Sequence, residues 1–349
     1  MVARYAAGHV IDSVVVMESG GGPRDGLFDE IVFEGGDPTP FKAALVGKKM
    51  LGMHRKGKQL WMALEGDENV LFHFGMTGSF VVKDKEKHTY KSFKIEDEGP
   101  DGEKVWPPRF AKMEIVFSNG IRVAFCDPRR LGRIRVRRGD PTLMAPISEL
   151  APDPVLDGID VEGYFAAGLA KASCPVKALL LDQNKLLCGV GNWVADEVLY
   201  QAGIHPSTMC NCLNKKGVAA LARSIREVLN TAIECNERRT QFPDNWLFHY
   251  RWGKSNSPHK AMPNGQAITF QTVGGRTSAI VLAQQPKSSA LTSTDLAGDF
   301  EDEGGEGKTV APKKRKERTS SAGVKVEGKK KAKVAVEAST RTSQREKKK

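Results

Sequence analysis

Residues 177–206 contain the groups needed to hold a single anion. Gly189 and Gly191 flank Val190 and predict a tight turn, because glycine tolerates a positive φ and a close backbone approach. Asn192 comes next and is a good N-cap for the helix that follows. Backbone N–H groups, an amide and a helix N-terminus then meet at one corner, which suits a phosphate. An ordinary helical hairpin with a glycine-rich corner explains this stretch alone equally well.

Four further patches place a cation or an apolar side chain beside glycine on a strand, loop or hairpin. They are Lys58 after a glycine on a strand, H-F-G-M-T-G with Met76, D-P-R-R-L-G with Arg129 and Leu131, and G-G-R-T with Arg276. An apolar wedge and an arginine on separate loops can enter a DNA duplex and fill the space left by an extruded base. Taken singly, each patch has a simpler reading: Met76 in a core, Arg129 in a salt bridge, Arg276 at a solvated turn.

In this order, from about residue 8 to 283, the motifs closely resemble the formamidopyrimidine-DNA glycosylase / endonuclease VIII family. The segment G-V-G-N with A-D-E-V-L-Y-Q-A-G-I-H-P is similar to the family's helix–two-turn–helix signature and is highly specific. The resemblance implies an α+β fold, with a DNA cleft between an N-terminal β-sandwich and a helical domain. It also implies excision of oxidised purines or formamidopyrimidines from damaged double-stranded DNA, followed by β/δ-elimination at the abasic site.

The same resemblance implies a role for each matched residue. Lys58 is expected to be the catalytic lysine near the lesion, and Arg276 the finger arginine that contacts phosphate and assists elimination. Five positions are expected to bind DNA: Met76 and Arg129 filling the void, Leu131 as the wedge, Asn192 holding a phosphate beside the lesion, and Lys177.

Two departures from the family pattern affect the chemistry. The bacterial finger binds zinc through four cysteines, whereas Cys235 is the last cysteine here. We therefore expect a plant-type zincless finger, with no metal and no cofactor. The family begins Met-Pro-Glu and uses the proline as nucleophile, whereas this chain begins Met1-Val2-Ala3, so we expect the start of the first helix to be missing. Lys58 would form an imine only if burial or cationic neighbours lowered its pKa.

The missing Pro-Glu leaves a second function open, that of a catalytically inactive protein that binds damaged or abasic DNA. A third and weaker reading is a general architectural DNA protein that binds through its basic tail. Retention of lesion preference after deletion of 287–349 would exclude this third reading.

The hydrophobic pattern divides the chain into four parts that must position these residues. Residues 1–136 predict a β-sandwich or barrel, with strands over 10–17, 50–64 and 70–82, a long loop over 84–108, and a hairpin over 112–125. Residues 146–240 predict a helical DNA-binding domain, with helices over 161–171, 177–187, 193–201 and 215–233. Residues 241–286 predict the finger, with a hairpin around 263–265. Residues 287–349 have the composition of a disordered basic tail.

Charge and hydropathy narrow the function class. From Lys313 onward there are 15 Lys/Arg and four Asp/Glu, which accounts for the whole net charge of +11, so a DNA surface on the rest must be local. P-K-K-R-K at 312–316 predicts import into the nucleus, with a solubilising or nonspecific DNA-binding tail as the alternative. No apolar run reaches the roughly 18 residues of a membrane span. We expect a monomer with no membrane partner and six free thiols in a reducing compartment.

Overall fold

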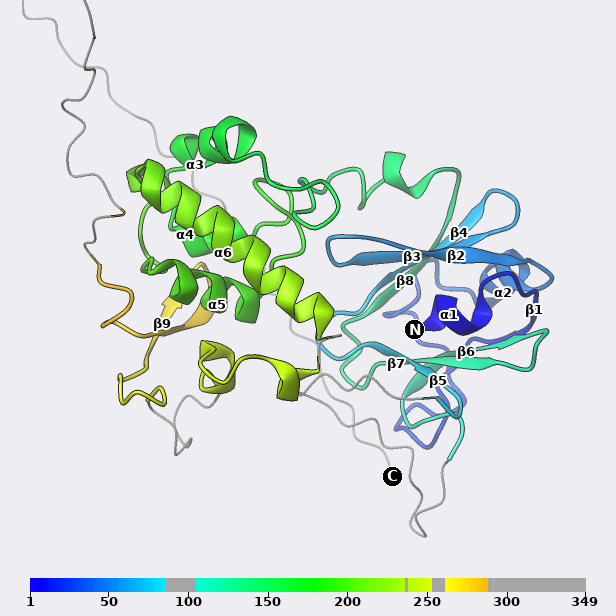
Figure 1. Cartoon of the computed structure of the whole chain (residues 1–349). Coiled ribbons are helices and arrows are strands. Elements are labelled where there is room, and N and C mark those ends of the chain that lie inside the picture. Colours follow the sequence, from blue (N-terminus) through cyan, green and yellow to red (C-terminus); the bar gives the residue numbers. More distant parts are fainter. Residues whose placement is uncertain (86–104, 236–237, 253–260, 288–290, 292–349) are drawn as a thin grey trace, which may run out of the picture. The chain divides into compact units, whose positions relative to one another are not determined.

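The computed structural model of the chain (Figure 1) describes all residues except 86–104, 236–237, 253–260, 288–290 and 292–349. Every described residue belongs to one compact unit, Met1–Ala297. Most of the loop expected over 84–108, nearly all of the tail expected to be disordered, and the basic run at 312–316 lie outside the described residues.

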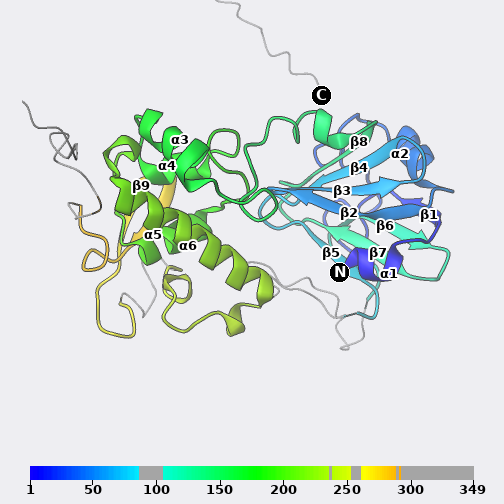
Figure 2. The ribbon, with the colours of Figure 1, turned by 45° about the horizontal axis from the view of Figure 1, so that its top comes forward.

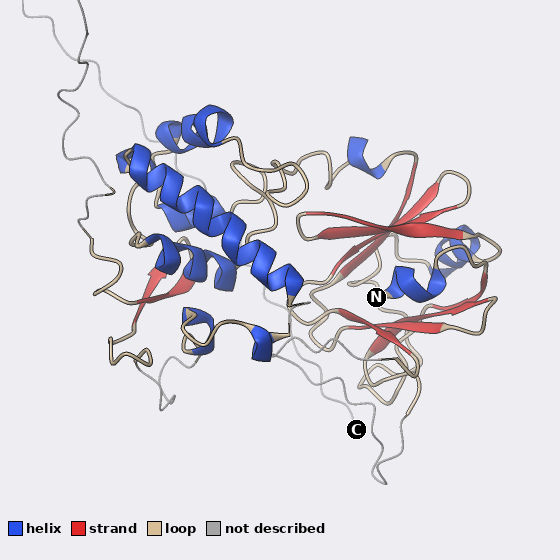
Figure 3. Cartoon of the chain, viewed as in Figure 1, coloured by secondary structure: helices blue, strands red, loops and turns tan. Residues whose placement is uncertain are grey.

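Two four-stranded antiparallel sheets form the N-terminal part of the chain (Figure 3). The first has the order β1 (Ile11–Val15), β6 (Ala111–Phe117), β7 (Arg122–Cys126), β5 (Ser79–Val82). The second has the order β2 (Met50–Lys56), β3 (Gln59–Leu64), β4 (Glu68–His73), β8 (Arg133–Arg138). Both sheets contribute to one core that includes Met62, Phe72, Ile115 and Phe125. The predicted β-sandwich is therefore confirmed.

Several boundaries in this part differ from the prediction. The run 50–64 is two strands, and Lys58 lies in the turn between them rather than on a strand. The run 70–82 is likewise divided between β4 and β5, which belong to different sheets. The helix α1 (Val2–Ala6) lies where the remainder of the first helix was expected, whereas the helix α2 (Pro38–Leu45) and the strand β8 were not predicted. The start of α2 has a clear local cause, because Asp37 accepts a hydrogen bond from Thr39 N and Pro38 occupies the first turn.

Helices dominate residues 161–234 and share a second core. They are η2 (Val161–Phe165), α3 (Ala166–Lys171), α4 (Val176–Leu181), α5 (Asn192–Ala202) and α6 (Lys215–Glu234). The short helices η1 (Pro141–Leu143), η3 (Cys210–Cys212), η4 (Arg239–Gln241) and η5 (Leu247–His249) lie in the connections. α5 and α6 lie side by side in both ribbon views (Figure 1, Figure 2), and Val198, Leu221 and Ile225 are buried between the helices.

The helix predicted over 177–187 is shorter than expected, because α4 ends at Leu181. The side chain of Gln183 explains the ending. Its Nε2 donates to Leu181 O at 2.9 Å, and its Oε1 accepts from Gly189 N at 2.9 Å. These bonds hold the chain in a loop that competes with further helix.

A two-stranded hairpin closes the described part of the chain. β9 (Thr269–Val273) pairs with β10 (Arg276–Ile280) around Gly274 and Gly275, both of which have positive φ. The turn expected around 263–265 is present, and among the described residues it carries one antiparallel bridge, between Ala261 and Ala267. Among the described residues, no group of three His, Cys, Asp or Glu side chains is placed to hold a metal ion. None of the described helices has the length and apolarity needed to cross a membrane.

Candidate functional site

Lys58 lies against the glycine-rich corner that precedes α5. Its Nζ donates a hydrogen bond to Val190 O at 2.8 Å. The preceding Gly57 has a φ of +55, and a Cβ at that position would lie 2.9 Å from Cys188 Sγ. Only glycine therefore fits this turn. The predicted catalytic lysine and the predicted phosphate corner are thus brought together from distant parts of the chain.

The environment of Lys58 lowers the pKa of its side-chain amine. Burial and the positive charge of Arg276 lower its pKa to about 8, against a smaller opposing effect of Cys188. With that pKa, roughly a tenth of the Lys58 amines are neutral at pH 7. Burial and a cationic neighbour, either of which would lower the pKa enough for imine formation, are therefore both present. The cationic neighbour is Arg276 of the finger hairpin.

Asp153 holds the turn that carries Lys58, a role that was not predicted from the sequence. Its Oδ2 accepts from Arg55 Nη1 at 2.6 Å and from Gly57 N at 2.7 Å. Its Oδ1 accepts from Val155 N at 2.9 Å. Burial alone would raise the pKa of Asp153, but the Arg55 and backbone hydrogen bonds lower it overall. The sequence signal was the pair of prolines flanking Asp153, which indicates a fixed turn.

Gln183 braces the corner from the other side. Its Nε2 donates to Val190 O at 3.1 Å, so this carbonyl receives both Gln183 and Lys58. Together with its bond from Gly189 N, Gln183 spans the corner. The corner is therefore fixed by a side chain rather than by glycine conformation alone.

Asn192 reaches the finger hairpin rather than capping its own helix. Gly191 is the N-cap of α5, and no side chain caps this end. The expected N-cap role of Asn192 is therefore wrong, because its Nδ2 donates to Thr277 O at 3.1 Å on β10. The Oδ1 atom of Asn192 is buried without a partner among the described residues. Since Thr277 follows Arg276, the two predicted phosphate ligands share one neighbourhood.

Lys177 is not placed to touch DNA, and the expected contact is corrected to a structural one. Its side chain is 0% exposed. Its Nζ donates to Asp196 Oδ1 at 2.5 Å, Ser278 Oγ at 2.7 Å and Thr277 O at 3.0 Å. Burial lowers the pKa of Lys177, whereas the Asp196 carboxylate raises it. Lys177 thus ties α4, α5 and β10 together behind Asn192.

Asp196 completes this buried cluster. Its Oδ2 accepts from Arg251 Nη2 at 2.7 Å and from Ala279 N at 3.2 Å. The carboxylate therefore balances two cations and binds the backbone of the finger hairpin. Neither Asp196 nor Arg251 was singled out from the sequence, because their partners lie far away along the chain.

Met76, Arg129 and Leu131 project from two loops that touch. Met76 is 59% exposed and Leu131 is 41% exposed, while Arg129 is also exposed. Met76 is therefore not a core residue. Asp127 joins the two loops, since its Oδ1 accepts from Thr77 Oγ1 at 2.6 Å and its Oδ2 accepts from Gly132 N at 2.6 Å.

His73 connects these loops to the Lys58 turn. It pairs with Gln59 across β3 and β4, and its Nδ1 accepts from Gly75 N at 3.2 Å. Burial, and then the positive charge of Lys58, lower the pKa of His73. Of the seven site residues expected from the sequence, the six other than Lys177 therefore fall into two sets. The first set surrounds the corner and consists of Lys58, Asn192 and Arg276. The second set lies on the loop after β4 and the loop between β7 and β8, and consists of Met76, Arg129 and Leu131.

Comparisons with known proteins agree with this geometry. Residues 2–134 match the formamidopyrimidine-DNA glycosylase N-terminal domain, and residues 150–244 match the formamidopyrimidine-DNA glycosylase H2TH domain. A Thermus thermophilus formamidopyrimidine-DNA glycosylase is 35% identical over 253 residues, which are 69% of this chain and 84% of that protein. The chain belongs to the formamidopyrimidine-DNA glycosylase family. The resemblance drawn from the motifs is thereby confirmed.

Other family members extend the comparison. An Arabidopsis thaliana formamidopyrimidine-DNA glycosylase is 40% identical over 253 residues, and the match spans 72% of this chain but only 62% of that protein. The crystal structure of the Thermus thermophilus MutM (Fpg) protein has a TM-score of 0.59 at 27% identity, covering 82% of this chain and 96% of that one. Lactococcus lactis Fpg, bound to DNA containing an abasic site, has a TM-score of 0.61 at 23% identity, with coverages of 82% and 95%.

Proposed function

We propose that this protein is a base-excision repair enzyme that removes oxidised purines and formamidopyrimidines from double-stranded DNA and then nicks the abasic site by β/δ-elimination. The observation that supports this most is the meeting of Lys58, Asn192 and Arg276 at one corner, beside loops that expose Met76, Arg129 and Leu131. A cationic, amide-lined corner next to apolar and arginine wedges suits a flipped nucleotide with its phosphate held.

In this proposal, Arg276 and Asn192 hold the phosphates beside the lesion. Arg276 carries a permanent charge, and Asn192 has one amide hydrogen left after its bond to Thr277 O. The N-terminus of α5 adds its unpaired N–H groups at the same place. Met76, Arg129 and Leu131 occupy the space of the extruded nucleotide and so offset the lost stacking.

Lys58 moves protons near the base and is the described lysine best suited to form an imine. Imine formation needs a neutral amine, which attacks the abasic aldehyde carbon and releases water. The lowered pKa of Lys58 supplies that form near neutral pH. Its bond to Val190 O would break first, so approach of the sugar must displace this contact.

That same bond favours the second candidate, a protein that binds abasic DNA without cleaving it, because the Lys58 ammonium is already engaged. Borohydride trapping on abasic duplex DNA separates the two candidates. A covalent adduct with the full chain excludes the pure binder. Lesion-specific binding with neither adduct nor nicking excludes the enzyme.

We also propose that the protein acts as a monomer in the nucleus and that its finger folds without zinc. The basic run at 312–316 and the lack of cysteine after Cys235 support this. Replacing Lys313, Lys314, Arg315 and Lys316 with alanine should move a fluorescent fusion out of the nucleus. Unchanged nuclear accumulation would contradict import through this run. The mass in solution, by light scattering, tests the monomer.

A further inference from the structure

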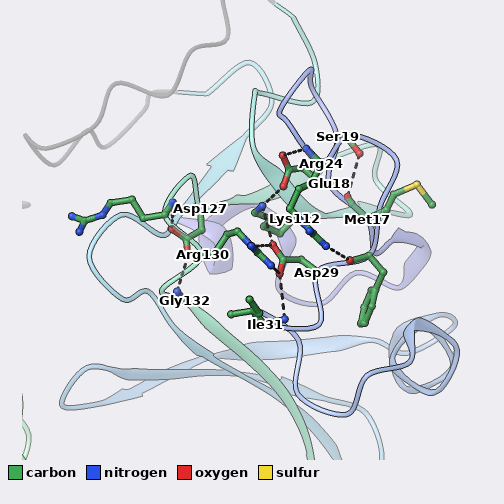
Figure 4. Close-up of polar contacts among 12 residues, drawn as sticks. Met17, Glu18, Ser19, Arg24, Asp29, Ile31, Lys112, Asp127, Arg130 and Gly132 are labelled. Atoms are coloured by element: carbon green, nitrogen blue, oxygen red, sulfur yellow. Dashed lines mark hydrogen bonds and ion pairs between the residues drawn. The ribbon is translucent and has the colours of Figure 1, made fainter. Parts of the chain in front are cut away.

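Arg130 lies between Arg129 and Leu131 and has a backbone conformation that non-glycine residues rarely adopt. Its φ is +56, and such a conformation persists only where the surroundings hold it. The guanidinium of Arg130 stabilises this conformation through two hydrogen bonds to Asp29. Nε donates to Asp29 Oδ2 at 2.8 Å and Nη2 donates to Asp29 Oδ1 at 3.0 Å (Figure 4). Arg130 therefore anchors the loop, whereas the side chains on either side of it are exposed.

Lys112 holds Asp29 in turn. Its Nζ lies 3.1 Å from Asp29 Oδ2, and it also pairs with Glu18 (Figure 4). All three side chains are at most 1% exposed. Because Lys112 is part of β6, two successive ion pairs connect a buried strand to the loop of Arg129 and Leu131.

The charges of this cluster balance only while Lys112 is present. Glu18 and Asp29 are opposed by Lys112 and Arg130. Burial would raise the pKa of Asp29, but hydrogen bonds from Arg130 and Lys112 outweigh it and lower that pKa to about 2. Without the ammonium, two buried carboxylates would face one remaining cation, and the bidentate pair between Asp29 and Arg130 would weaken.

We propose that Lys112 is a positioning residue for lesion recognition, acting through Asp29 on Arg130 so that Arg129 and Leu131 are aimed at the DNA. This inference rests on the proposed function, because it assigns Arg129 and Leu131 to the void beside a lesion. Lys112 is buried and acts only through its neighbours. It is thus separate from the residues that meet the DNA.

Binding by the full chain tests the proposal without depending on catalysis. Lys112→Met removes the ammonium but keeps the length of the side chain. We expect it to weaken binding to a duplex carrying a tetrahydrofuran abasic analogue by about tenfold, a typical coupling for a contacting network. Binding to the same duplex without the analogue should not change. Val123→Ala, in the buried core on the neighbouring β7, is the control for lost stability and should change neither affinity.

A double-mutant cycle separates positioning from general stability. In an Arg129→Ala/Leu131→Ala background, Lys112→Met should cause no further loss of analogue binding, because the groups it aims are gone. An equal loss in both backgrounds would overturn the proposal.

Arg130→Ala provides a second variant, since its side chain is 30% exposed and the change leaves Lys112 in place. It should reproduce the loss of analogue binding, and unchanged analogue preference in the folded variant would also overturn the proposal. A wild-type protein with no preference for the analogue would instead contradict the proposed function itself.

Discussion

The positive charge of Arg276 adds to burial in lowering the pKa of Lys58, although Arg276 belongs to the last hairpin of the described chain and Lys58 to a turn of the N-terminal sandwich. Two cations close together are unfavourable unless an anion joins them. In the proposed function, a DNA phosphate is that anion.

The first prediction concerns the pH dependence of this pair. Lys58 has a pKa of about 8, so a step that needs its neutral amine becomes faster as pH rises through 8. Arg276→Ala removes one cause of the lowered pKa, and the rise should move to higher pH. Single-turnover nicking of an abasic duplex between pH 6 and 10 measures it, and Arg276→Lys, which keeps the charge, should retain the wild-type position. The same profile in all three proteins would contradict the coupling.

The second prediction separates phosphate ligands from structural cations. Arg276→Ala should weaken DNA binding and reduce the slope of log affinity against log salt by about 1, since one phosphate contact is lost. Lys177→Met should leave that slope unchanged. It should instead lower the free energy of unfolding by about 3 kcal/mol, because the buried Asp196 loses a partner. If Lys177→Met also reduced the salt slope, Lys177 would be a phosphate ligand and its assignment as a structural cation would be wrong.

The third prediction concerns the turn that presents Lys58. Asp153→Ala leaves Gly57 N and Arg55 without their acceptor, and the free energy of unfolding should fall by about 1–3 kcal/mol. Urea unfolding at pH 7 measures the loss. Asp140→Ala, at an exposed position that bonds only its own turn, should change stability little. Equal effects of the two changes would show that Asp153 does not anchor this turn.

The fourth prediction concerns the packing of the two exposed loops. Gly75 has a φ of +59, and a Cβ there would lie 2.6 Å from the backbone of Leu131. Gly75→Ala should therefore separate the loops and weaken binding to a duplex with an abasic analogue. Gly26→Ala is the matched control, because Gly26 has a φ of +77 but open space around its Cβ position. It carries the same kind of backbone strain, about 1 kcal/mol, without the clash. Equal losses of lesion binding in both variants would argue against loop contact.

The fifth prediction concerns the basic tail. Removal of residues 298–349 takes away 16 Lys/Arg and 9 Asp/Glu, a net charge of +7, but keeps Leu291, whose carbonyl accepts from Asn214 N. Affinity for undamaged DNA should fall, since it depends on charge. Preference for damaged over undamaged duplex, measured by competition, should survive. Loss of that preference would favour the architectural function.

The sequence predicts the local features well and the long-range ones poorly. The Asn119-Gly120 turn and the antiparallel pairing of β6 with β7 are set by neighbouring residues, and both appear as expected. Asn192 was expected to cap its own helix because its distant partner, Thr277 O, is invisible to local patterns. Lys177 was placed on DNA by the family resemblance, and only the fold shows its buried partner Asp196. The family resemblance supplied the remaining site residues that periodicity alone would have left scattered.

Single-turnover cleavage by the full chain tests the central claim most directly. Two duplexes of one sequence are compared, one with 8-oxoguanine and one with guanine at the same position. We predict nicking at the 8-oxoguanine alone, with loss of nicking in Lys58→Met and retention in Val123→Ala. Equal rates of nicking of the two duplexes, or undiminished nicking by Lys58→Met, would contradict the account.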